Sequence, residues 1–184
     1  MSENRDINAD LLLEAASKCV TFAVYRNIGD NVLYPLAGLV DEFGEYLDAL
    51  DANTDLAAIF SEHCDVLWYL NQLAWELSRL DVPDLTWGTH IRWMLEVSPD
   101  ESLEPQRRQN VFRAMARLAG IVKKIDRDGV RSLTSEKILA IEKNFKVIIV
   151  GLDLSRPLGS YFYLIDKLSG RQNRGTLHGD GDVR

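Results

Sequence analysis

Apolar residues recur at three- and four-residue spacing along most of this chain, which is the periodicity of helices with one buried face. Where the chain is richest in Val and Ile, over 146–152, the apolar stripe continues from the residues before it, so this stretch is predicted to be a buried helical turn and not a strand. The predicted helices cover approximately residues 8–29, 33–50, 54–80, 87–95, 103–125, 134–154 and 157–168. No alternating strand pattern between hairpin turns appears, and the sequence therefore predicts an all-α helical bundle.

Short polar motifs mark the expected ends of these helices. Asp51-Ala-Asn-Thr-Asp55 predicts a turn that supplies the next N-cap, and Thr134 is placed to begin a later helix. Gly29 and Pro83 are expected to end helices, because glycine adopts non-helical backbone freely and proline cannot continue the hydrogen-bond ladder. The helix over 54–80 has the longest apolar side and is expected to be the most buried.

The net charge of −7 divides unevenly along the chain. Residues 1–96 hold 17 acidic and 5 basic residues, whereas residues 97–184 hold 11 acidic and 16 basic ones. We therefore predict an acidic helical half over 1–96, a basic helical half over 97–169 that packs on the first, and a tail over 170–184 rich in glycine and arginine. Such a division suits a metal held by one half and phosphates held beside it, although two solvated surfaces of opposite sign are the simpler interpretation.

Several classes of protein are excluded or disfavoured by what the sequence lacks. No apolar run approaches the ~18 residues of a membrane span, and the first twenty residues do not have the pattern of a secretory signal, so a cytoplasmic protein without a membrane partner is expected. Cys19 and Cys64 lie in apolar helical patterns and are expected to be reduced, buried thiols. No nucleic acid polymer is expected as a partner.

Two pairs of carboxylates carry the clearest chemical signal. Glu42-x-x-Glu45 and Glu62-x-x-Asp65 each place two side chains on one helix face, with Cβ atoms ~5–6 Å apart. Because the flanking residues are apolar, both pairs are expected at the edge of the core. Like charges ~4 Å apart repel by about 4 kcal/mol even at an effective dielectric constant of 20, so a cation is needed. Oxygen ligands without cysteine or histidine favour Mg²⁺, with Mn²⁺ also suitable.

Two other interpretations of the carboxylates remain open at this point. A di-iron bundle would need Glu-x-x-His motifs, but His63 directly follows Glu62 and so points ~100° away around the helix. Either carboxylate pair alone is also commonplace on the solvated face of a helix. The two pairs together, set among apolar residues, favour a metal site.

The same motifs are similar to those of a known family. The segments Leu36-Ala-Gly-Leu-Val-Asp-Glu-Phe-Gly-Glu45 and Glu62-His-Cys-Asp-Val-Leu-Trp-Tyr-Leu70 resemble the signature of the MazG-like all-α nucleoside triphosphate pyrophosphohydrolases. The end of the chain, from Lys167 to Arg184, also resembles the tail of many members, although Leu164 stands where the family often has asparagine. The resemblance implies a bundle of the MazG-like type and cleavage of a nucleoside triphosphate to its monophosphate and pyrophosphate. It also implies that magnesium is bound by Glu42, Glu45, Glu62 and Asp65.

An internal repeat adds a second expectation. Leu36-Ala-Gly-Leu-Val recurs as Leu118-Ala-Gly-Ile-Val122, and two shorter matches follow with shrinking offsets, which suggests a tandem duplication that forms a pseudo-dimer. In the second copy the four carboxylates become Lys124, Arg127, Lys143 and Lys146. These bases are expected either to bind phosphate or to neutralise the acidic pairs, with the helices near 54–80 and 134–154 packed against each other. A homodimer is a further possibility, since family members commonly assemble from paired helical subunits.

Other candidates for substrate binding are Trp68, which is placed to stack on a base, and the tail residues Lys167, Arg171 and Arg174, which are placed to clamp phosphates. The first functional hypothesis is a Mg²⁺-dependent pyrophosphohydrolase acting on ribo- or deoxyribonucleoside triphosphates. The alternative is a non-catalytic helical protein that keeps the scaffold, binds a nucleotide or a partner, and closes the acidic pairs internally with its own bases.

Overall fold

In the computed structural model of the chain, residues 3–82, 85–96, 105–152 and 157–177 are described. All regular structure in these ranges is helical, without a strand, so the predicted all-α class is confirmed. The helices are α1 (Glu3–Val20), α2 (Leu33–Asp51), α3 (Leu56–Ser78), α4 (Trp87–Glu96), α5 (Pro105–Asp128), α6 (Ser135–Gly151) and α7 (Pro157–Asn173), with a short 3₁₀ turn η1 (Val130–Ser132) before α6. The predicted caps also form, since the Asp55 side chain accepts from the Ala58 amide and the Thr134 side chain accepts from the Lys137 amide.

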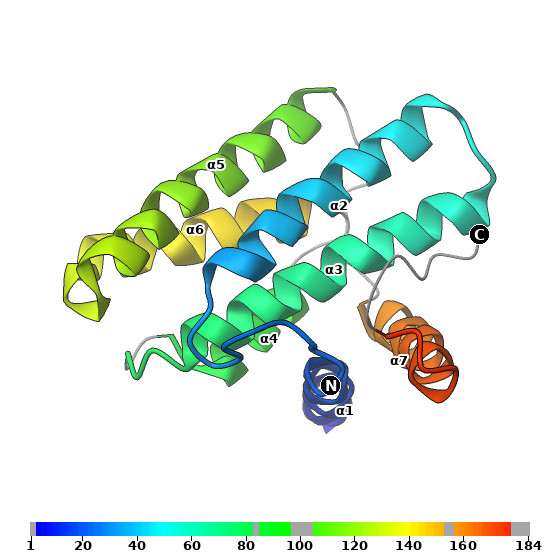
Figure 1. The fold of residues 1–184 in the computed structure, drawn as a ribbon, viewed down its shortest axis with the longest axis horizontal. Helices are drawn as coiled ribbons and strands as arrows, with labels where there is room; N and C mark the ends of the chain where they lie inside the picture. The colour runs from blue at the N-terminus through cyan, green and yellow to red at the C-terminus, as the bar shows by residue number, and fades with distance from the viewer. Residues whose placement is uncertain (1–2, 83–84, 97–104, 153–156, 178–184) are drawn as a thin grey trace.

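Two helical hairpins form the body of the molecule (Figure 1). Helix α2 packs along α3, α5 packs along α6, and α2 joins the hairpins by packing on α5. Helices α1 and α7 lie together, seen nearly end-on in Figure 1, and both contact α3. One hydrophobic core cluster extends from Leu12 to Leu168, so the acidic and basic parts of the sequence share a core. Among the described residues, no helix has the length and apolar character needed to cross a membrane.

Helix α3 is the centre of this core, as its apolar pattern predicts. Ten of its residues are buried, including the polar Asn71 and Gln72. The Asn71 amide donates to the Ala16 carbonyl of α1 at 3.1 Å, and its oxygen accepts from the Tyr161 hydroxyl of α7 at 3.1 Å. Buried polar groups of this kind are tolerated because they are hydrogen-bonded, and these bonds define how α1 and α7 sit on α3. Cys19 and Cys64 are both buried, free thiols, as expected.

The first predicted helix is shorter than its apolar pattern suggests. Helix α1 ends at Val20 and not near Gly29, and the segment over 21–32 turns inward toward α3. Glu76, which is completely buried, accepts hydrogen bonds from the Tyr25 hydroxyl at 2.6 Å, the Gly29 amide at 2.8 Å and the Asn31 amide at 3.0 Å. Satisfying these donors requires a folded loop, so a tertiary contact overrides the helical periodicity.

The last helix is longer than predicted and extends into the expected tail. Helix α7 continues past Leu168 to Asn173 and ends with Gly175 at a φ of +71°. The Thr176 amide donates to the Arg171 carbonyl at 3.0 Å, the bond of a Schellman motif, in which glycine adopts the left-handed conformation at little cost. The first part of the 170–184 tail is therefore helical, and residues 178–184 lie outside the described residues.

The expected packing between the longest apolar helices is not found. Within the described ranges, α3 and α6 do not pack along each other, and the two hairpins meet through α2 and α5. The apolar surface of α3 is already covered by α1, α2, α4 and α7. His63 Nε2 of α3 lies 2.8 Å from the carbonyl oxygen of Leu152, the residue just after the end of α6. The tandem duplication itself stays a prediction.

We predict that the buried histidine of α4 makes the fold sensitive to acid. His90 is fully buried and stacks on Phe145 with ring centroids 5.0 Å apart. Neither ring nitrogen of His90 forms a hydrogen bond of normal geometry to the described residues. The nearby Ala74 backbone favours the protonated ring, but its effect on the pKa is smaller than that of burial. Burial lowers the pKa of His90 from 6.5 to about 4. The folded protein therefore holds a neutral ring under conditions that protonate the unfolded chain.

Because the pKa is lowered by folding, this stability is present above pH ~6.5 and is lost progressively as the pH falls toward 4. Urea unfolding of the wild type and of His90→Leu at pH 7 and pH 4.5 measures the effect. The wild type should lose about 2–3 kcal/mol more than the variant between the two values. An equal loss in both proteins would show that His90 is not the acid-sensitive group.

Candidate metal centre

Three carboxylates from two helices converge at one point of the α2–α3 hairpin. Glu42 of α2 and Glu62 and Asp65 of α3 each bring one carboxylate oxygen to within 4.8 Å of the other two. Two oxygens bound to the same Mg²⁺ lie about 3–4 Å apart, because each is ~2.1 Å from the ion. A small change of side-chain rotamer would therefore bring all three oxygens to one ion.

A glycine lets the two helices come close enough for this arrangement. Gly38 lies one turn before Glu42, and a Cβ at this position would be 2.1 Å from Cε1 of Tyr69. Such a distance is far inside van der Waals contact, so the Tyr69 ring lies directly against the backbone of α2. Because Asp65 is one turn before Tyr69 on α3, the same close approach brings the facing carboxylates together.

Glu45, the fourth predicted ligand, is placed differently. Its side chain is exposed, and it is outside the group of three oxygens. Its charge is still near enough to Glu42 to raise the pKa of that carboxyl. The structure therefore brings together three of the four predicted carboxylates and leaves Glu45 at the rim of the cluster.

The electrostatics of the cluster favour a bound cation. Burial, followed by the charges of Asp65, Glu45 and Glu62, raises the pKa of Glu42 from 4.5 to about 8. Without a metal, Glu42 therefore carries a proton near neutral pH, because the other carboxylates disfavour another negative charge. A divalent cation removes this repulsion and would favour the ionised form of Glu42.

Lys167 of α7 brings a positive charge to the same cluster. Its ammonium group pairs with Asp65 Oδ2 and donates to the Ser61 hydroxyl at 3.2 Å. The side chains of Lys167 and Asp65 are only 15% and 21% exposed, so water screens this pair less than a surface ion pair. Lys167, one of the eight residues predicted to bind substrate, is therefore in direct contact with a metal-ligand candidate.

The aromatic residues next to the cluster form a continuous group. Tyr34 stacks on Tyr25 with ring centroids 4.8 Å apart and also contacts Tyr69 at 6.3 Å. Tyr34 is 47% exposed, whereas burial and the neighbouring Tyr34, Glu42 and Asp65 raise the pKa of Tyr69 well above its usual value. Trp68 is half-buried and donates from Nε1 to the Cys19 carbonyl at 3.3 Å. The indole of Trp68 thus holds α3 to α1, and Tyr34 is the most exposed ring of this group.

The bases of the predicted second copy do not gather around the carboxylates. Arg127 forms an ion pair with Asp128 and, together with Lys124, lies near the start of α6. Lys143 and Lys146 lie farther along α6, where they line a groove shared with α5. Lys137, which also lies close to Asp128, precedes Lys143 by six residues, or about 9 Å of helix. Helix register therefore separates the four bases into two groups.

The remaining tail residues follow Lys167 on the same chain segment. Arg171 is half-buried one turn farther along α7, and Arg174 is exposed just after the helix.

The sequence pattern did not single out Ser61, Gly38 or Tyr34. The spacing of Ser61 and Asp65, four residues apart, was the available signal for Ser61, because it places both side chains on one helix face. Gly38 and Tyr34 depend on contacts between helices and had no such signal.

The donor set of this cluster suits a hard divalent cation. Glu42, Glu62 and Asp65 offer carboxylate oxygens only, and His63 is turned away toward the Leu152 carbonyl. Oxygen ligands without sulfur or imidazole are typical of Mg²⁺ and Mn²⁺ sites. The raised pKa of Glu42 is the second observation that fits a cation here.

Comparisons with known proteins give no match to this chain among family models, curated proteins or solved structures.

Proposed function

We propose that this protein is a Mg²⁺-dependent nucleoside triphosphate pyrophosphohydrolase of the MazG-like type. The observation that carries the proposal is the convergence of Glu42, Glu62 and Asp65 on one point between α2 and α3. The resemblance of the motifs that contain these residues supports the same reaction. The products would be the nucleoside monophosphate and pyrophosphate.

The side chains of the cluster have separate tasks in this proposal. Glu42, Glu62 and Asp65 would hold the metal, and the exposed Glu45 is placed at the rim to accept a hydrogen bond from a water ligand. Bound Mg²⁺ supplies neutralisation of the phosphate charge and a water of lowered pKa. The ammonium of Lys167, which now pairs with Asp65, is positioned to turn to a phosphate oxygen when the carboxylates bind the ion.

A nucleobase could be recognised by the neighbouring aromatic group. Tyr34 is half exposed and is held in place by contacts with Tyr25 and Tyr69, so part of its ring surface is accessible to a ligand. Stacking on such a ring is sequence-tolerant, because every base has a π-face. Arg171 follows Lys167 by four residues on α7, so a second positive charge lies on the same face of this helix.

The alternative is a non-catalytic protein that binds a nucleotide or a partner. The contact of Lys167 with Asp65 favours it, because this cation partly neutralises the carboxylates from within the chain. The four bases of the predicted second copy do not have this role, since they lie in two groups elsewhere. The two proposals differ in whether the cluster takes up Mg²⁺ at millimolar concentration.

The deciding experiment combines metal titration with a substrate panel. Calorimetric titration of Mg²⁺ into the protein should show one site, and a set of canonical and damaged nucleoside triphosphates should be assayed for pyrophosphate release. Metal-dependent production of monophosphate and pyrophosphate supports the enzyme. The absence of metal uptake at millimolar Mg²⁺ contradicts the metal site and supports the non-catalytic protein. Metal uptake without turnover of any nucleotide in the panel contradicts the hydrolase.

Replacing Lys167 by methionine is expected to tighten Mg²⁺ binding by about tenfold. The variant loses the cation that competes with the metal for Asp65. Repulsion among the carboxylates therefore increases in the metal-free protein, and binding of Mg²⁺ relieves more of it. Lys123→Met on the exposed face of α5 is the matched control and should leave the affinity unchanged. Calorimetry measures both. Equal affinity in Lys167→Met and wild type would show that Lys167 does not compete with the metal.

A further inference from the structure

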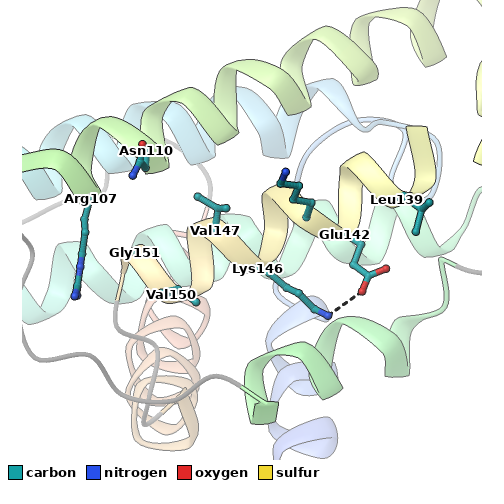
Figure 2. A pocket seen from close by; sticks show the side chains of 9 residues that line it. Arg107, Asn110, Leu139, Glu142, Lys146, Val147, Val150 and Gly151 are labelled. Carbon is teal, nitrogen blue, oxygen red and sulfur yellow. Dashed lines mark hydrogen bonds and ion pairs between the residues drawn. The ribbon is translucent and has the colours of Figure 1, made fainter. Parts of the chain in front are cut away.

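A cavity lies along α6 and shares no lining residue with the carboxylate cluster. It has a volume of about 520 Å³, within the 300–1,000 Å³ typical of small-molecule sites. Figure 2 shows Arg107 and Asn110 of α5 on one side and α6 along its length. The α6 residues recur at three- and four-residue spacing and so form one helix face: Leu139, Glu142, Lys143, Lys146, Val147 and Val150.

Aliphatic side chains that are exposed to solvent line this groove. Leu139 is 64% exposed and Val150 is 39% exposed, and Val147 lies between them on the same face. From residue 139 to residue 150 the helix rises ~16 Å, so the apolar surface is elongated. Exposed aliphatic side chains that gather in a cavity, in contrast to scattered ones, are typical of a binding site.

Positive charge borders this apolar surface. Three bases line the groove against one acid, in a chain whose net charge is −7. Lys146 pairs with Glu142 at 2.8 Å, as the dashed line in Figure 2 marks, and its ammonium lies 5.9 Å from the centre of the Trp93 ring. Lys143 is exposed and has no hydrogen bond or ion pair within the part of the chain that the structure describes. Its charge is therefore available to a ligand.

We propose that this groove binds a small amphipathic anion, with one negatively charged group on an elongated aliphatic body. The aliphatic body would lie along Leu139, Val147 and Val150, and the anionic group would pair with Lys143 or, at the other end, with Arg107. The cavity volume, the apolar floor and the available cation each support this ligand class. The site is independent of the proposed hydrolase function, because it uses none of the cluster residues.

The test uses three probes that separate charge from apolar surface. Calorimetric titration with decanoate is expected to show one site per chain. Decyltrimethylammonium has the same chain with the opposite charge, and acetate has the same charge without the chain, so both should bind at least about tenfold more weakly. Equal binding of the two ten-carbon probes, several equivalent sites per chain, or no binding of decanoate would each overturn the proposal.

Variants then locate the site. Lys143→Glu is expected to weaken decanoate binding by about tenfold, and Val147→Asn should weaken it by a similar factor through loss of apolar contact. Lys123→Glu makes the same charge change at an exposed position outside the groove and should leave decanoate affinity unchanged. Circular dichroism and the melting temperature verify that each variant is folded. If Lys143→Glu and Lys123→Glu bind decanoate equally well, the anion does not use this groove.

Discussion

Replacement of Glu62 by glutamine or of Asp65 by asparagine is expected to lower pyrophosphate release by about 100-fold or more. Each change removes one charged oxygen ligand from the cluster while it keeps the volume of the side chain. Both residues lie on α3 at half-buried positions, so the helical fold should be retained. Steady-state assay of pyrophosphate at saturating Mg²⁺, together with far-ultraviolet circular dichroism, measures the two expectations.

A matched control distinguishes the loss of a metal ligand from the loss of one negative charge elsewhere in the acidic half of the chain. Asp48 is exposed on α2, one turn beyond Glu45, and is outside the cluster. Asp48→Asn makes the same chemical change as Asp65→Asn and should keep the wild-type rate. Wild-type turnover in Glu62→Gln or Asp65→Asn would contradict the assignment of the cluster, and equal losses in Asp48→Asn would point to a long-range charge effect instead.

The second large effect is expected on stability, at the buried carboxylate of α3. Glu76→Ala should lower the free energy of unfolding by about 3–5 kcal/mol, because it leaves three buried or half-buried donors without their acceptor. These donors are the Tyr25 hydroxyl and the amides of Gly29 and Asn31. Urea unfolding measures the loss, and a change of less than about 1 kcal/mol would show that water replaces Glu76 at little cost.

A milder variant keeps this expectation testable if Glu76→Ala does not fold. Tyr25→Phe removes a single hydroxyl donor and leaves the two backbone amides bonded to Glu76, so it should cost about 1–2 kcal/mol. Tyr25 also stacks on Tyr34, which in turn contacts Tyr69 beside the cluster. The Tyr25→Phe ring preserves this stacking, so a change in stability without a change in nucleotide affinity is expected.

Local pattern was sufficient for most of the secondary structure and for the carboxylates. Helix formation depends on neighbours three and four residues apart, and this information is present in the sequence itself. The same spacing places Glu62 and Asp65 on one face of α3. Their proximity to Glu42 needed one further assumption, namely that α2 and α3 pack as neighbours, which a short connection favours.

The sequence-based predictions differ from the structure where contacts between distant segments decide the outcome. The apolar pattern after Val20 would permit a longer helix, but Glu76 on α3 draws the 21–32 segment into a loop. The internal repeat aligned Lys124 and Lys146 with carboxylates of one cluster, whereas Lys124 lies near Asp128 at the end of α5 and Lys146 lies in the groove farther along α6. Register depends on how side chains of both helices interlock, which no spacing within one helix encodes.

The sequence by itself determined that this protein is an all-α bundle with paired carboxylates on two helices, since both properties follow from local periodicity. Only the tertiary structure decided which basic side chains lie close to which acidic ones. It brought Lys167 of α7 to Asp65 and placed Lys143 and Lys146 on a separate groove. The physical reason is that an ion pair depends on distance in space, and the helices that carry these residues are brought together by the shared core and not by their order in the chain.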